Sequence, residues 1–251
     1  MKNMTTTLSF AAALTLTLAA GAPLAYAEDA PAAKPDNEVS YNAALTSEYR
    51  YRGISQSRLK PAVQGGIDYV NNPTGLYVGA WASSIKWIKD LGGDDNVELD
   101  LYGGKRGEIV TGVSYDVGFL RYLYPSNALS VNADTSEVYA QVGYGPGYIK
   151  YSHATTNLFG TGDSKGSGYL DLSANFDVAE GLQLNLHVGR QRVAHNGVYS
   201  YNDYKVGLTK DVGFASVSLA LIGTDSDAYV SPVDNKNLGK TRAVLAISKT
   251  F

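Results

Sequence analysis

From Val39 onward, apolar and polar residues alternate along most of the chain with a period of two. In residues 168–178, for example, Leu170, Leu172 and Phe176 alternate with Asp171 and other polar side chains. An extended strand turns successive side chains to opposite faces, so this period predicts strands with one apolar and one polar face. Helical spacing fits none of these stretches.

Twelve stretches of this kind can be marked, most of them near the roughly 9–11 residues that a tilted strand needs to cross a bilayer. They are residues 39–52, 62–70, 75–86, 96–104, 108–121, 136–145, 147–154, 168–178, 181–190, 201–210, 213–223 and 240–251.

The connections between these stretches alternate in length. The short ones are 71–74, 105–107, 146, 179–180 and 211–212, and the long ones are 53–61, 87–95, 122–135, 155–167, 191–200 and 224–239. Short periplasmic turns and long external loops are typical of outer-membrane barrels. The pattern therefore predicts an all-β fold, a transmembrane antiparallel up-and-down β-barrel of about twelve strands. The glycine-rich loop 155–167 can fold inward or project outward, and the sequence leaves both directions open.

The beginning of the chain has the pattern of an export signal. Lys2 supplies a positive charge, residues 8–20 form an apolar run, and the small residues around Ala27 form a cleavage site. We expect a signal peptide at 1–27, a disordered leader at 28–38 that is rich in Pro, Ala and charge, and the barrel at 39–251. This organisation predicts the outer membrane of a Gram-negative bacterium as the location.

The composition excludes several classes of function. There is no cysteine, so disulfides and thiolate metal sites are ruled out. A net charge of -3 provides no basic surface for nucleic acid. Glycine-rich stretches lie outside any strand–loop–helix context, which argues against phosphate binding. We expect no cofactor and no metal.

Tyrosine dominates the aromatic residues, with 19 Tyr against 6 Phe and 2 Trp. Amphipathic rings prefer the membrane–water boundary, so aromatics near the strand ends predict two girdles. The periplasmic set is Tyr41, Tyr69, Tyr77, Tyr144, Tyr148 and Phe251, and the external set is Tyr49, Tyr51, Trp87, Tyr122 and Tyr201.

The chain stops at Phe251, which closes an alternating stretch with Leu245 and Ile247 on the same face. A terminal aromatic of this kind resembles the assembly signal of outer-membrane barrels. Expected partners are therefore the barrel assembly machinery and outer-membrane lipid.

Several segments together resemble one known family. They are SEYRYRGISQS (47–57), KPAVQGGIDY (60–69), GLYVGAWAS (75–83), ELDLYGGKRGEI (98–109), SYDVGFLRYLYP (114–125), EVYAQVGYG (137–145), YLDLSANF (169–176), LHVGRQ (186–191) and SKTF (248–251). This series resembles the TorF family of proteobacterial porins, long classed as conserved hypothetical proteins, and covers about 39–251. The resemblance implies an outer-membrane barrel with a transport role.

Strand parity directs many charged residues toward the interior. The pore-lining and selectivity candidates are Glu48, Arg50, Arg52, Asp68, Glu98, Asp100, Asp171, Asp203, Lys205 and Arg242. The first three share one face near the external end and are the first candidates for a constriction. These charges can brace a wet lumen, act as a selectivity field, or do both. The inward acids outnumber the inward bases, which predicts a mild cation preference.

These features predict a porin for passive diffusion of ions or small polar solutes, because twelve strands enclose less space than 16–18-strand porins do. We expect no enzymatic activity. One alternative is a barrel hydrolase with Ser136 and His153, which have lipid-facing parity at the external ends of neighbouring strands. The other alternative is a structural or adhesive barrel with a blocked lumen.

Overall fold

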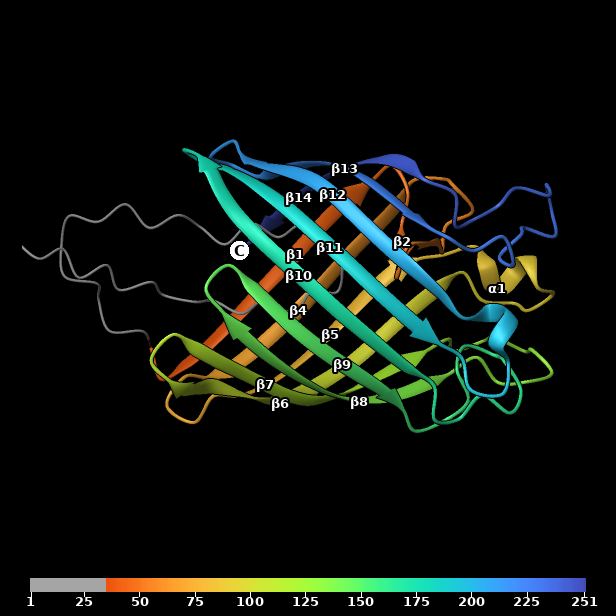
Figure 1. The fold of residues 1–251 in the computed structure, drawn as a ribbon, viewed down its shortest axis with the longest axis horizontal. Helices are drawn as coiled ribbons and strands as arrows, with labels where there is room; N and C mark the ends of the chain where they lie inside the picture. Colours follow the sequence, from red (N-terminus) through yellow and green to blue (C-terminus); the bar gives the residue numbers. More distant parts are fainter. Residues whose placement is uncertain (1–34) are drawn as a thin grey trace, which may run out of the picture.

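Twelve antiparallel strands close into a barrel in the computed structural model, which describes residues 35–251 (Figure 1). In barrel order these strands are β1 (Asn37–Thr46), β4 (Ala62–Asn71), β5 (Leu76–Ser84), β6 (Val97–Val110), β7 (Val113–Leu123), β8 (Thr135–Tyr144), β9 (Gly147–Ala154), β10 (Gly168–Ala179), β11 (Leu182–Arg192), β12 (Tyr201–Asp211), β13 (Ser216–Thr224) and β14 (Arg242–Thr250). The predicted all-β barrel of about twelve strands is confirmed.

The first and last strands form the seam of the barrel. β1 pairs with β14 on one side and with β4 on the other, both antiparallel. Beyond the last paired strand residue, the Phe251 N–H donates to the Tyr41 carbonyl at 2.8 Å. Closure leaves no strand edge unpaired, which a barrel exposed to hydrocarbon requires.

Small elements gather at the end of the barrel that holds the long loops, which we call the long-loop end. They are the two-stranded sheet of β2 (Arg50–Tyr51) and β3 (Ile54–Ser55), helix α1 (Trp87–Asp90) and the 3-10 turn η1 (Gly197–Tyr199). Figure 1 shows the short turns and the C-terminus at the opposite, short-turn end. Within residues 35–251, no helix is long and apolar enough to span a membrane.

The two faces of the wall differ in chemistry, as the alternation predicts. On β10, Leu170 and Leu172 are exposed on the outer face, while Asp171 and Ser173 are buried inside. The same alternation runs through the other long strands. The barrel therefore has an apolar exterior and an interior with many polar and charged groups.

Two of the predicted boundaries are wrong. The first predicted stretch, 39–52, leaves the wall after Thr46. The chain then reverses at Arg52 and Gly53, whose φ angles are 45° and 79°. The predicted turn at 105–107 is part of β6, and the chain turns instead at Gly112, where φ is 83°. Arg106 consequently has the same parity as Asp100 and points inside.

The predicted signal peptide and most of the predicted leader lie outside the described residues. The barrel begins at Asn37, two residues before the predicted start at Val39.

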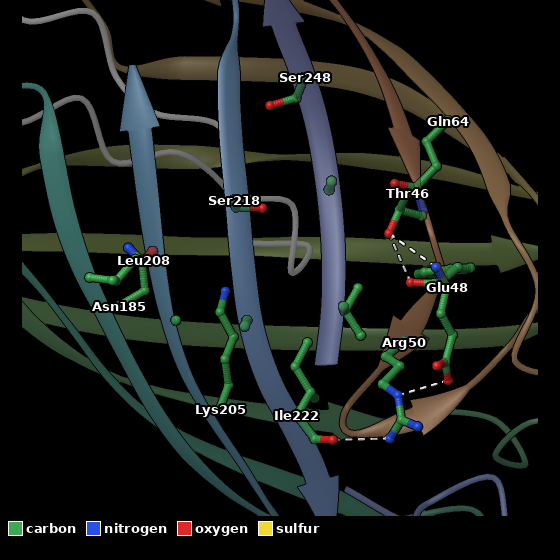
Figure 2. A pocket seen from close by; sticks show the side chains of 15 residues that line it. Thr46, Glu48, Arg50, Gln64, Asn185, Lys205, Leu208, Ser218, Ile222 and Ser248 are labelled. Atoms are coloured by element: carbon green, nitrogen blue, oxygen red, sulfur yellow. Dashed lines mark hydrogen bonds and ion pairs between the residues drawn. The ribbon is translucent and has the colours of Figure 1, made fainter. Parts of the chain in front are cut away.

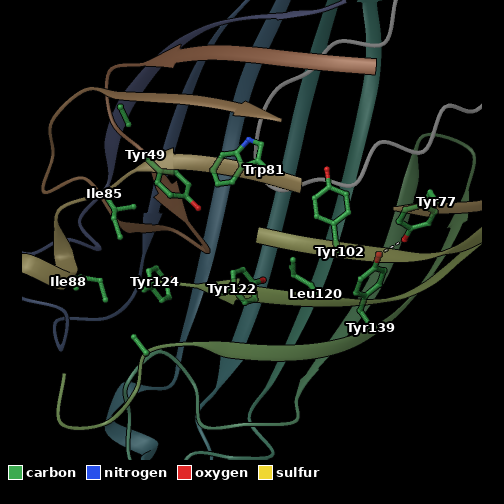
Figure 3. Packing of buried hydrophobic residues seen from close by; sticks show 12 residues of the cluster. Tyr49, Tyr77, Trp81, Ile85, Ile88, Tyr102, Leu120, Tyr122, Tyr124 and Tyr139 are labelled. Carbon is green, nitrogen blue, oxygen red and sulfur yellow. Dashed lines mark hydrogen bonds between the residues drawn. The ribbon is translucent and has the colours of Figure 1, made fainter. Parts of the chain in front are cut away.

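Aromatic side chains of one buried cluster extend from the long-loop mouth along the lumen to Tyr77 and Tyr139 (Figure 3). Tyr49, Trp81, Tyr122 and Tyr124 belong to one buried cluster in which Tyr49 and Trp81 pack edge to face at 5.5 Å. Much of the predicted girdle is therefore wrong, since the tyrosines at 49, 51, 77, 122, 148 and 201 face the interior. Inward glycines explain part of this, because Gly104 and Gly118 lie directly beside tyrosine rings and give them room.

Candidate functional site

The segment 47–61, between β1 and β4, folds back into the long-loop mouth of the barrel, and we call it the inward hairpin. Its residues Glu48, Arg50 and Arg52 are only 4%, 4% and 7% exposed. Ile54 and Ser55 are also buried, so part of the long connection 53–61 lies inside the mouth and does not project from it. The chain reverses at Arg52 and Gly53, which directs Arg52 across the lumen, while Glu48 and Arg50 stay near β13 and β14.

Arg52 joins the inward hairpin to three strands of the wall. Its Nη1 and Nη2 donate to the two carboxylate oxygens of Glu137 on β8 at 2.9 and 2.7 Å. Nη1 also donates to Gln191 on β11 at 2.8 Å, and the guanidinium lies 4.1 Å from the ring centroid of Tyr169 on β10. A forked ion pair of this kind is geometrically specific and strong where water is excluded.

Arg50 anchors the other side of the inward hairpin (Figure 2). Its Nε lies 2.8 Å from Glu48, and its Nη1 donates to the Gly53 carbonyl at 2.8 Å and to the Ile222 carbonyl on β13 at 3.2 Å. Arg242 on β14 approaches Glu48 at 3.7 Å. Glu48 is therefore held between two cations.

Tyrosine hydroxyls satisfy the carboxylate of Glu98 on β6. Tyr49 of the inward hairpin donates to it at 2.6 Å, and Tyr124 donates at 2.7 Å. The hydroxyls of Tyr51 and Tyr122 are also hydrogen-bonded to each other. These contacts fasten the hairpin to β6 and β7 through neutral donors.

The loop 155–167, whose direction the sequence left open, packs over the inward hairpin at the mouth of the barrel. Phe159 packs edge to face on Tyr51 and Tyr122, with centroids 5.6 and 5.1 Å apart. Leu158 and Ser164 of the same loop are buried. The loop therefore folds over the mouth and reinforces the hairpin.

Deeper in the lumen, a histidine bridges two carboxylates. His187 Nδ1 lies 2.9 Å from Asp171, and Nε2 lies 2.8 Å from Asp203. Ser173 and the Tyr169 hydroxyl complete the cluster at 2.9 and 3.0 Å from the same ring nitrogens. Because each ring nitrogen of His187 faces a carboxylate oxygen, both nitrogens carry protons. The ring then has no free lone pair with which to act as a general base. We interpret the cluster as a brace between β10, β11 and β12.

The remaining predicted residues also lie on the lumen side. Asp68 accepts a hydrogen bond from Tyr102 at 2.6 Å. Asp100 is 0% exposed, and neither of its carboxylate oxygens has a hydrogen-bond partner among the described residues. Lys205 lies on the lumen side of β12, and Arg242 lies on the lumen side of β14. All ten candidates thus lie inside, seven by the parity of wall strands and Glu48, Arg50 and Arg52 through the inward hairpin, while their role in selectivity stays a prediction.

The pair proposed for a hydrolase does not assemble. Ser136 Oγ accepts a hydrogen bond from Arg121 at 2.8 Å, and Arg121 also forms an ion pair with Asp134. His153 is the register partner of Val138, and no hydrogen bond joins it to Ser136 in the part of the chain that the structure describes. Across residues 35–251, no group of three or more His, Asp or Glu side chains is arranged to hold a metal ion.

A small cavity remains beside the inward hairpin, open to the lumen. It offers about 40 Å³ and is lined by Glu48, Arg50, Gln64, Lys205 and Ser218 among others (Figure 2). One water needs roughly 10–15 Å³ measured in this way, so the space holds about three waters. In this conformation the cavity is too small for a sugar ring.

Two ionisable groups in the loops of the long-loop end have shifted pKa values. A hydrogen bond to Asp90 raises the pKa of the Arg58 guanidinium above its ordinary value. The backbone N–H of Asn202 donates to Asp225 and lowers the pKa of that carboxyl. Both interactions favour the charged forms, so these loops keep their ion pairs and hydrogen bonds at neutral pH.

Comparison with known proteins gives a family and a fold. The family described as "Bacterial protein of unknown function (Gcw_chp)" matches residues 29–251. No curated protein sequence matches the chain. Among solved structures, the KdgM porin is similar at a TM-score of 0.53 and 7% identity, covering 85% of this chain and 98% of that one. The NanC porin is similar at a TM-score of 0.55 and 8% identity, with the same coverage. At these identities the likeness shows the fold alone.

Proposed function

We propose that this chain, which belongs to the Gcw_chp family of bacterial proteins, forms an outer-membrane channel for ions and small polar solutes. In the conformation described here, the inward hairpin closes that channel. The TorF porin family, which the sequence resembles, would place the same protein among transport barrels.

One observation carries the proposal: a connecting segment, the inward hairpin, fills the long-loop mouth of the lumen. The wall strands point charged and polar side chains inward, from Asp68 on β4 to Arg242 on β14. The aromatic layer beneath the mouth includes Tyr49 and Tyr51 of the inward hairpin itself. Displacing this segment would unblock the mouth without breaking any backbone hydrogen bond between the twelve wall strands.

The barrel shape supports this reading. KdgM and NanC are named as porins, and one KdgM structure is described as a complex with disordered oligogalacturonate. The space of about 40 Å³ in our protein holds no sugar unit. Because the inward hairpin also fills the long-loop mouth, we infer that a solute of that size passes only when the hairpin moves.

Planar-bilayer recording tests the proposal. The purified full-length protein should show infrequent openings, and replacing residues 48–58 with a short Gly-Ser turn should make it conduct continuously. Shortening the exposed loop at 232–236, also at the long-loop end, is the matched control and should leave the closed state dominant. A hairpin-less barrel that inserts, keeps its heat-modifiable gel shift and passes no current would overturn the channel.

That outcome would favour the second candidate, a structural barrel with a blocked lumen. The closed mouth is the observation in its favour, since Tyr122, Tyr124, Glu98 and Glu137 are almost fully buried there. A solid barrel needs all of these side chains for packing, whereas a channel needs them only in the closed state.

A further inference from the structure

The cavity beside the inward hairpin contains more cations than carboxylates. Arg50 and Lys205 both line it, and Glu48 is the single carboxylate in its lining (Figure 2). The cavity faces the lumen between β1, β4 and β12–β14, so a solute in the lumen would reach it directly.

Glu48 is already neutralised. Its carboxylate lies 2.8 Å from the Arg50 Nε and 3.7 Å from the Arg242 Nε, with 4% of the residue exposed. Two cations share this one carboxylate, so the group as a whole is positive. Glu48 therefore cannot also compensate the charge of Lys205.

Lys205 lies across the cavity and forms no ion pair with any carboxylate among residues 35–251. Its register partners on the neighbouring strands are His187 and Ile222. Asp171 acts on Lys205 only at longer range, and its Oδ1 is engaged by His187 and Ser173 while its Oδ2 accepts from Tyr148. Lys205 is half-buried beside the cavity, so an anion bound there would give its ammonium group a charge-assisted hydrogen bond that no carboxylate among the described residues provides.

Ser218 adds a neutral donor to the same cavity. Its hydroxyl oxygen is seen at the cavity in Figure 2, and the neighbouring strand β14 contributes small residues such as Ala246. Other polar side chains there are already committed, since the Asn185 amide bonds to Asn175, Gln183 and Thr209. One cation and one hydroxyl beside a space of about 40 Å³ suit a planar group of three heavy atoms.

We propose that this cavity is a subsite for the carboxylate group of a small organic anion. Lys205 supplies the charge and Ser218 a hydrogen bond. The inference rests on the proposed function in naming a class of solute, but binding is measurable without conduction. A failure of this inference is therefore distinguishable from a failure of the channel.

Saturation-transfer difference NMR on the full-length protein in a nonionic detergent provides the test. The probes are acetate and acetamide, which match in size and differ in charge. We expect saturation of the acetate methyl in the wild type, weakened roughly tenfold in Lys205→Gln because a charge-assisted hydrogen bond is lost. Acetamide should receive little saturation.

Two further variants guard against an indirect effect. Lys205→Arg keeps the charge and should retain the acetate signal. Lys210→Gln removes a lysine from the outer face of the same strand and should behave as wild type. Equal acetate signals in wild type and in a Lys205→Gln protein with an intact heat-modifiable shift would overturn the subsite. Equal signals from acetamide and acetate would overturn the assignment to carboxylates.

Discussion

Arg52 connects the inward hairpin to three strands of the barrel wall through its side chain. Its forked pair with Glu137 is buried, and both partners are less than a tenth exposed. Removing one partner of a buried pair leaves an uncompensated charge, which costs roughly 3–5 kcal/mol. That cost falls on the closed state alone, because an open hairpin would leave both groups in water.

Arg52→Ala should therefore shift the channel toward the open state. We expect the open probability in planar bilayers to rise by about tenfold or more at fixed voltage. Lys236→Ala is the control, since Lys236 pairs with Asp234 in an exposed loop at the same end and its side chain is 58% exposed. Equal open probabilities for wild type and Arg52→Ala would show that this ion pair does not hold the closure.

Gly53 allows the hairpin to lie against the wall. Its φ of 79° is strained for other residues, and a Cβ there would lie 2.5 Å from Thr224 Cγ2 and 2.7 Å from Asp203 Cβ. In Gly53→Ala the hairpin should leave its place, and trypsin should cleave after Arg50 or Arg52 in the folded barrel. Mass spectrometry of limited digests detects this cleavage. Gly197→Ala, where a Cβ would meet nothing within 4 Å, should stay protected, and equal protection of both variants would contradict the account.

At the scale of elements, the strands were predictable because each wall strand has apolar side chains facing lipid and polar side chains facing the lumen. Every second residue of β10 or β12 therefore reports its face directly. The inward hairpin was not predictable by this route, because Glu48, Arg50 and Arg52 continue the parity of β1. Gly53 is the residue that indicates a chain reversal in this segment. It can be interpreted in this way only once the end of β1 at Thr46 is known.

Side-chain partners were harder still to predict. Parity places Arg52 and His187 inside, but it does not say that Arg52 reaches Glu137 or that His187 bridges Asp171 and Asp203. The His187 cluster depends on the register of β10, β11 and β12. The Arg52 contacts depend on a loop crossing the lumen. Neither is encoded in a local pattern of residues.

The last strand closes the seam through its final residue. The Phe251 N–H donates to the Tyr41 carbonyl and the Phe251 carbonyl accepts from the Tyr41 N–H, at 2.8 and 3.2 Å. Deleting Phe251 should reduce the amount of assembled protein, because hydrocarbon does not tolerate unpaired backbone groups. The heat-modifiable shift of membrane fractions measures this, with Phe251→Tyr as the control that keeps the backbone bonds. A normal amount of the truncated barrel with its shift intact would show that the residue is dispensable.

For the whole molecule, the short and long connections define two ends. We predict that the long-loop end faces the outside of the cell. Cysteines at Ser126, Lys165 and Asn235, which are all exposed, should react with an impermeant maleimide on intact cells. Ser164 is unsuitable because its side chain is buried. Labelling of cysteines at Thr74 or Glu180 instead would invert the topology.

The central claim is that movement of the inward hairpin opens the barrel, and a reversible crosslink tests it most directly. The chain has no cysteine, so Ile54→Cys with Leu238→Cys introduces one defined pair. Both positions belong to one buried cluster, and the Ser55 N–H donates to the Leu238 carbonyl at 3.0 Å. Single-channel recording of this variant should show no openings when it is oxidised and wild-type openings after a reducing agent is added. Openings of the same frequency and size in both states would contradict the account.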